Sequence, residues 1–175
     1  MVLDASERSD MSTERETTDR HDRELLQRAV DLSRQGMRRG AGGPFGAVVA
    51  RRGEIVGEGF NRVTSANDPS AHAEVEAIRS ACRHLGTFEL RGCTLFASCE
   101  PCPMCLGAIY WARLDRLVYA NTSEDAAAID FDDAELYRQL RRPLAEQKLP
   151  SRHLPLEDAR RVFEEWKTFE AKILY

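Results

Sequence analysis

The sequence lacks any apolar run long enough to cross a bilayer, and it has no apolar leader at its start. After its first three residues, the opening stretch MVLDASERSDMSTERETTDR is polar and alternates in charge sign, so we expect a disordered arm over residues 1–20. A basic excess is also missing, because the formal net charge is −4 at pH 7, which disfavours nucleic acid as a partner. We therefore expect a cytoplasmic protein that binds neither membranes nor nucleic acids.

The cysteine content does not suggest a disulfide framework either. The chain has 5 cysteines, an odd number, and no secretory segment, so we expect reduced thiols that serve a metal or a reaction. With 175 residues, 42% of them hydrophobic and 31% charged, the chain has the composition of an ordinary soluble globular protein. We expect one domain over residues 21–175.

The hydrophobic pattern predicts an α/β fold. A helical pattern begins near Asp22 and stops at GAGGPFG, and the next stretch, AVVARRGEIVGEGF, is typical of two strands joined at Arg52 and Gly53. After these, the pattern predicts a helix in AHAEVEAIRSACRHLG, a strand in CTLFAS, a helix in PMCLGAIYWAR, a strand in DRLVYA and two further helices over 133–140 and 156–172. This order predicts a mixed sheet with helices on its faces.

Three cysteines stand together in SCEPCPMCLGA, at positions Cys99, Cys102 and Cys105. An iron–sulfur cluster is disfavoured because the ferredoxin motif continues with a fourth cysteine, whereas here LGAI follows. A structural zinc site needs a fourth ligand and usually a second ligand pair, which the sequence lacks. His72 can join Cys102 and Cys105 to give three ligands and an open fourth position, which is typical of catalytic zinc. A structural zinc module and a redox dithiol stay open as alternatives, and Cys99 is interpreted as a bystander.

The sequence around His72 and the cysteine motif favours a catalytic zinc site. We expect Asp68 to cap a helix with Pro69 in its first turn, so that His72 and Glu74 lie near a helix start. Residues two apart point to opposite sides of a helix, so His72 and Glu74 can converge only if the metal lies off the helix end. Glu74 then suits the role of proton carrier between a metal-bound water and a leaving nitrogen.

The motifs H-x-E and P-C-x-x-C, present as HAE at 72–74 and PCPMC at 101–105, form the signature of zinc-dependent nucleobase deaminases. From residue 22 to about 125 the chain resembles the cytidine-deaminase-like superfamily. That resemblance implies a three-layer α/β/α fold with a mixed sheet and one zinc per subunit between two helix N-termini. GGPFGAVV, NDPSAHAEV, SCEPCPMCLGAIYWAR and FDDAELY, together with the chain end, further resemble the bacterial guanine deaminases, which convert guanine and water to xanthine and ammonia.

The resemblance implies a role for each matching residue. The zinc ligands are His72, Cys102 and Cys105. The residues that handle protons are Glu74 and, from the FDD motif, Asp133. The residues assigned to the purine base are Phe45 and Trp111 as aromatic walls, Asn61 as a hydrogen-bond partner, Ala73, and Tyr175 as the residue that closes the pocket. The resemblance also implies a homodimer, with the segment from about 140 to 175 closing the active site, either that of its own subunit or, by exchange, that of the partner subunit.

Other interpretations stay open. Asp133 can simply cap the helix that begins at Ala134, and Trp111 can be ordinary core. A transfer-RNA adenosine deaminase shares the zinc motifs, but the mixed-sign tail LPLEDARRVFEEWKTFEAKILY and the acidic FDD motif do not favour an RNA groove. A cytosine or other small aminoheterocycle deaminase is a second alternative, and a non-catalytic zinc-stabilised binding module is a third.

Overall fold

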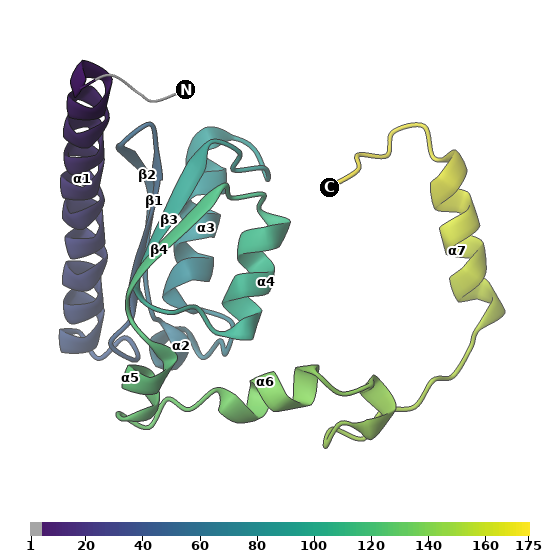
Figure 1. Ribbon diagram of the computed structural model, residues 1–175. Helices are drawn as coiled ribbons and strands as arrows, with labels where there is room; N and C mark the ends of the chain where they lie inside the picture. Colours follow the sequence, from purple (N-terminus) through teal and green to yellow (C-terminus); the bar gives the residue numbers. More distant parts are fainter. Residues whose placement is uncertain (1–4) are drawn as a thin grey trace. The chain divides into compact units, whose positions relative to one another are not determined.

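The computed structural model describes the backbone of residues 5–175 and the side chains of residues 17–175 (Figure 1). The chain divides into two units, residues 1–132 and residues 133–175, and each is described by itself. None of the helices among the described residues is both long and apolar enough to span a membrane.

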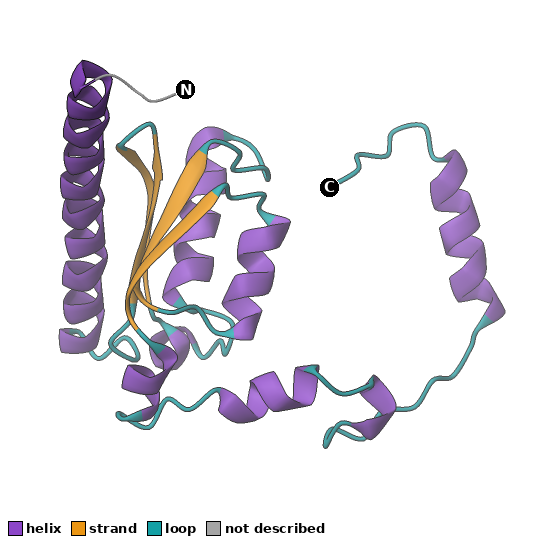
Figure 2. Cartoon of the chain, in the orientation of Figure 1, coloured by secondary structure: helices purple, strands orange, loops and turns teal. Residues whose placement is uncertain are grey.

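A mixed four-stranded sheet forms the centre of the first unit (Figure 2). Its strands, in the spatial order β2-β1-β3-β4, are β1 (Gly46–Arg51), β2 (Glu54–Phe60), β3 (Cys93–Cys99) and β4 (Arg116–Asn121). β1 is antiparallel to both of its neighbours, whereas β3 and β4 are parallel. Arg52 and Gly53 join β1 to β2 with φ angles of 53° and 86°, the positive values that a tight hairpin turn needs. The predicted hairpin is confirmed.

Helices cover both faces of this sheet. α1 (Ala5–Arg38) packs on one face, and α3 (Ala73–Leu85) and α4 (Pro103–Trp111) pack on the other (Figure 1). Two short helices, α2 (Val63–Ala66) and α5 (Ser123–Ala127), were not expected from the sequence and lie in the connections. The predicted three-layer α/β/α architecture is confirmed.

Strand β1 shows why the layers form. Successive side chains of a strand point to opposite faces, so Ala47 and Val49 join the core under α3 and α4. Val48 and Ala50 join the second core, under α1. All four are at most 4% exposed, so the strand is apolar on both faces up to the exposed Arg51 at its end rather than alternating with polar residues.

Helix α1 begins earlier than expected. Its bounds are Ala5–Arg38, whereas the hydrophobic pattern starts near Asp22, and among the side chains described, 17–175, the first buried one in this helix is Leu25. The disordered arm over residues 1–20 stays a prediction: residues 1–4 lie outside the described residues, and the side chains of residues 5–16 are not described.

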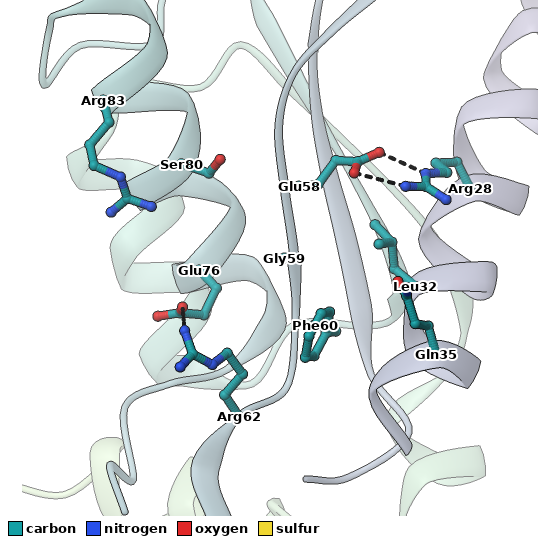
Figure 3. Close-up of a pocket in the computed structure, with 10 residues that line it drawn as sticks. All are labelled: Arg28, Leu32, Gln35, Glu58, Gly59, Phe60, Arg62, Glu76, Ser80 and Arg83. Atoms are coloured by element: carbon teal, nitrogen blue, oxygen red, sulfur yellow. Dashed lines mark hydrogen bonds and ion pairs between the residues drawn. The ribbon is translucent and has the colours of Figure 1, made fainter. Parts of the chain in front are cut away.

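Strand β2 lies at one edge of the sheet. A groove of about 360 Å³ follows this edge between α1 and α3 (Figure 3). Two ion pairs line it. Arg28 of α1 donates from Nε and Nη2 to the carboxylate of Glu58 at 2.7 and 2.9 Å, and Arg62 lies 3.5 Å from Glu76 of α3. The edge strand is thus flanked by charged side chains from both covering helices.

The second unit consists of α6 (Ala134–Leu140), the 3-10 helix η1 (Leu144–Glu146) and α7 (Glu157–Thr168). Both helices agree with those expected over 133–140 and 156–172, although α7 ends four residues early. All 43 residues of this unit, 133–175, are described, and none is buried. Its apolar side chains therefore do not form a core within the unit.

Candidate active site

Three residues that the sequence assigned to a metal meet in the first unit. One ligand atom each from His72, Cys102 and Cys105 lies within 4.8 Å of the other two. The Nδ1 atom of His72 is 3.6 Å from the sulfur of Cys102 and 3.4 Å from that of Cys105. Residues about thirty positions apart in the chain are thus brought to one point.

The two helix starts that carry the ligands explain this convergence. His72 is the N-cap of α3 and Cys102 is the N-cap of α4, and both have extended backbones, with ψ angles of 155° and 167°. A residue with this backbone is not yet helical, so its side chain leaves the helix end rather than joining one face. Glu74 lies inside α3, and the objection raised by the two-residue spacing therefore does not apply.

The expected cap at Asp68 was wrong. Asp68 Oδ1 accepts from the backbone N–H and the hydroxyl of Ser70, at 2.8 and 2.7 Å, which closes a local turn before the helix. α3 begins only at Ala73, four residues after Pro69. The turn thereby leaves His72 as the residue at the helix end.

The donor set fits a zinc ion. With Zn–S bonds near 2.3 Å and Zn–N bonds near 2.0 Å, a tetrahedral centre separates a thiolate sulfur from an imidazole nitrogen by about 3.5 Å. The separations of 3.6 and 3.4 Å from His72 Nδ1 to the sulfurs of Cys102 and Cys105 match this value. Two thiolates and one imidazole leave one tetrahedral position for a water molecule or a substrate.

The contacts among His72, Cys102 and Cys105 also favour the thiolate form of Cys102. Hydrogen bonding from Cys105 and His72 lowers the pKa of Cys102 to about 4. The same bond to Cys102 raises the pKa of His72, and the pKa of Cys105 is raised because its thiol is the donor to Cys102 and is buried. Burial raises the pKa of Cys99 to about 11, and its sulfur donates to Thr122 O at 3.4 Å, away from the cluster.

Glu74 lies beside the cluster in the first turn of α3. It is 8% exposed, and its Oε2 is 3.4 Å from the sulfur of Cys105. Burial raises the pKa of its carboxyl, because the loss of solvent disfavours the charged form. Ala73, between His72 and Glu74, is fully buried.

Asn61 follows β2 and is 5% exposed. Its Oδ1 accepts from the backbone N–H groups of Gly43 and Val63, each at 3.2 Å. With the oxygen so engaged, the amide presents its nitrogen as a donor elsewhere. The next residue ties Asn61 to the metal ligands, because the N–H of Arg62 donates to the carbonyl of Ala71, directly before His72, at 2.9 Å.

The remaining predicted residues lie in different settings. Phe45 directly precedes β1, and its carbonyl accepts from the N–H of Asn61 at 2.9 Å, so it neighbours the amide. Trp111 is the last residue of α4 and is 62% exposed, at the opposite end of the helix from Cys102. Asp133, the N-cap of α6, and Tyr175 belong to the second unit. Their roles stay predictions.

The family model of the cytidine and deoxycytidylate deaminase zinc-binding region matches residues 19–121, more than half of the chain. The chain belongs to this zinc-binding deaminase family. It is accordingly a hydrolytic deaminase acting on a C–N bond, and zinc is the cofactor that the family and the donor set both indicate.

Within this family, the chain is similar to proteins named as guanine deaminases. The guanine deaminase of Bacillus subtilis (strain 168) is 49% identical over 151 residues, which are 86% of this chain and 97% of the relative. The X-ray structure of guanine deaminase from Bacillus subtilis superposes with a TM-score of 0.85 at 48% identity, over 87% of this chain and 98% of that one. It has the α/β fold predicted here.

Two further relatives are more distant. The tRNA-specific adenosine deaminase of Aquifex aeolicus (strain VF5) is 32% identical over 123 residues, 70% of this chain and 79% of the relative. A solved homologue in complex with 2,6-diaminopurine is 37% identical, with a TM-score of 0.60 over 62% of this chain and 61% of its own. The guanine deaminase match thus extends over more of the chain than either of these.

Several residues near the site were missed by the sequence interpretation. Gly42 and Gly43 were noted only as a helix stop, and Phe131 only as part of the motif that contains Asp133. Glu100 was given no role, yet its carboxylate accepts from the N–H of Ser123 at 3.1 Å. The one signal in the sequence was the adjacent pair Gly42 and Gly43, which is not part of a phosphate-binding motif. Such a pair can mark a place where the backbone approaches another group closely.

Proposed function

We propose that this protein is a zinc-dependent guanine deaminase that converts guanine and water to xanthine and ammonia. The observation that carries the substrate choice is the Asn61 amide, whose oxygen is engaged by two backbone N–H groups, so that only its N–H donors remain for a ligand. Guanine offers acceptors at O6 and N7, whereas adenine has a donor at the position of O6. The identity to guanine deaminase over most of the chain supports the same choice.

His72, Cys102 and Cys105 hold the zinc in this proposal. Bound zinc lowers the pKa of a water molecule toward neutrality. Glu74 would accept a proton from the water that adds to the purine carbon carrying the amino group, and would pass that proton to the amino nitrogen, which leaves as ammonia when the C–N bond breaks. Its burial and its 3.4 Å distance from Cys105 suit it to both transfers.

The base is held between side chains of several elements in this proposal. Asn61 donates to the purine, Phe45 and Trp111 form its aromatic walls, and Ala73 contacts it. Asp133 is a second acid that helps to protonate the departing ammonia, and it also accepts from the N–H groups of the purine. Support for the polar contacts comes from the engaged oxygen of Asn61 and from the relative that binds a purine base.

The quaternary and cellular setting is part of the proposal. The protein forms a homodimer in which the segment from about 140 to 175 is exchanged and Tyr175 closes a site. The absence of buried residues in 133–175 supports a role for this segment in covering another surface. The 5 free cysteines support a reducing, cytoplasmic location, and release of ammonia from guanine would serve purine catabolism.

The test is ammonia release from guanine, adenine, cytosine, cytidine and an adenosine-containing transfer RNA, each with and without a zinc chelator. We expect chelator-sensitive release from guanine alone, restored by added zinc. Release only from the RNA would overturn the proposal in favour of transfer-RNA editing. Release from cytosine or cytidine alone would keep the chemistry but overturn the substrate.

A further inference from the structure

The loop of residues 42–45, between α1 and β1, holds the Asn61 side chain. The N–H of Gly43 donates to Asn61 Oδ1 at 3.2 Å. A Cβ atom at Gly42 would collide with the same oxygen, so only glycine leaves room for the amide there. The orientation of the amide, and with it the donor that faces the ligand, therefore depends on where this loop lies.

Phe131 packs on that loop from the other side. Its ring meets the Phe45 ring edge to face, with centroids 4.9 Å apart and planes at 88°. A Cβ atom at Gly43 would lie 2.8 Å from Phe131 Cζ, so the ring already touches the backbone that donates to Asn61. Aromatic pairs of this geometry stabilise a contact beyond what the burial of their area provides.

The segment that carries Phe131 is itself anchored next to the metal ligands. The N–H of Phe131 donates to Ala126 O at 3.0 Å, in helix α5. That helix is fixed by a capping box between Thr122 and Asp125 and by the bond from the N–H of Ser123 to Glu100, two residues before Cys102. A continuous chain of contacts therefore joins the Cys102 loop to the loop that orients Asn61.

We propose that Phe131 is a positioning residue for the purine, which holds the loop of residues 42–45 and thereby fixes the Asn61 amide relative to the metal ligands. It acts through Phe45 and Gly43 and does not itself take part in the chemistry. The inference rests on the proposed function, because it concerns the binding of guanine at the same site.

The experiment compares steady-state kinetics on guanine for the wild type, Phe131→Ala and Ile129→Ala. Ile129 is the matched control, because it lies in the same segment and is 51% exposed, against 45% for Phe131. We expect Phe131→Ala to raise KM about fivefold to tenfold, with kcat within about threefold and zinc content unchanged. Ile129→Ala should leave all three values near those of the wild type.

A double-mutant cycle tests the contact directly. Gly43→Ala forces a Cβ against Phe131 and should raise KM, and part of that effect should disappear in the Gly43→Ala, Phe131→Ala double variant, because the ring is gone. Should Phe131→Ala fail to fold, Gly43→Ala paired with Phe131→Leu measures the same coupling. Strictly additive effects in the cycle overturn the inference.

The failures of the two proposals are distinguishable. A wild-type protein that binds zinc but releases no ammonia from guanine defeats the proposed function. A wild-type protein that does turn guanine over, with a Phe131→Ala variant whose KM equals that of Ile129→Ala, defeats only the positioning role.

Discussion

The two units of this chain differ in what they bury. Residues 1–132 hold two apolar cores, one on each face of the sheet, and the candidate site lies where two helices of this unit begin. Residues 133–175 bury nothing, although they expose many large apolar side chains, among them Leu136, Leu140, Leu149, Leu154, Val162, Phe163, Trp166, Phe169, Ile173 and Leu174. Because each buried large apolar side chain stabilises by about 1.5–3 kcal/mol, the second unit gains little from its own fold. The first unit brings the candidate metal ligands together, whereas the second leaves its large apolar side chains exposed.

The largest effect is expected inside the first unit, at Glu74. Glu74→Gln keeps the size and hydrogen bonding of the side chain but cannot carry the proton, so kcat on guanine should fall by about 10³-fold or more. Metal analysis should show unchanged zinc. Glu76→Gln, in the same helix turn but outside the cluster, is the control and should stay within about threefold of the wild type. Substantial turnover by Glu74→Gln would remove Glu74 from the mechanism.

The next effect tests whether the second unit contributes to the chemistry. Asp133→Asn should keep zinc and the thermal unfolding temperature but lower kcat about 10²-fold, because a second acid for the leaving nitrogen is lost. Asp132→Asn, its neighbour in sequence, serves as the control. Equal kinetics for the two variants would leave Asp133 only as the N-cap of α6.

A third prediction concerns the exposed apolar side chains of α7 and the proposed homodimer. On α7, Val162 and Trp166 lie four residues apart and are 59% and 43% exposed, with Phe163 beside them at 74% and Phe169, directly after the helix end, at 53%. Trp166→Ser combined with Phe163→Ser should weaken the proposed homodimer by about tenfold or more, seen as a lower mass in light scattering at micromolar concentration. Glu165→Ser on the same helix should not change the mass. A double variant that keeps the wild-type mass would contradict this role.

The smallest effect is a difference between Cys102 and Cys99 in how their alkylation rates depend on pH. In zinc-depleted protein, the pKa of about 4 keeps Cys102 a thiolate above that pH, so its alkylation rate should stay nearly flat from pH 6 to 8. The pKa of Cys99 is about 11, so the thiolate fraction and the rate should rise about tenfold per pH unit over that range. Mass spectrometry of modified peptides measures both. Cys99→Ser should retain zinc and activity, and loss of the metal in that variant would instead make Cys99 a ligand.

More of the structure could be predicted from the sequence for the first unit than for the second. Helix α3 was predicted because its apolar face is set by local spacing, and strand β3 because it is a short, continuous apolar run. The N-cap at His72 was not, because Asp68 is also a good cap and only the turn it forms with Ser70 decides between the two. Phe131 was missed for a different reason, since its contact with Phe45 joins residues far apart in the chain. Residues 133–175 carry helix signals, but no pattern in the sequence indicates whether their apolar side chains contact another surface.

The charged edge of β2 has a consequence for the protein in concentrated solution. An edge strand presents unpaired backbone groups on which a second chain can add, and such addition is a route to aggregation. Here the Arg28–Glu58 pair and the Arg62–Glu76 pair flank the edge, so an incoming strand would have to desolvate or displace charged groups before it could pair. The side chains of Arg28 and Glu58 are 45% and 33% exposed, so salt screens them and weakens this protection. The residues that line the groove beside β2 therefore also help to prevent edge-to-edge pairing of the sheets of separate molecules.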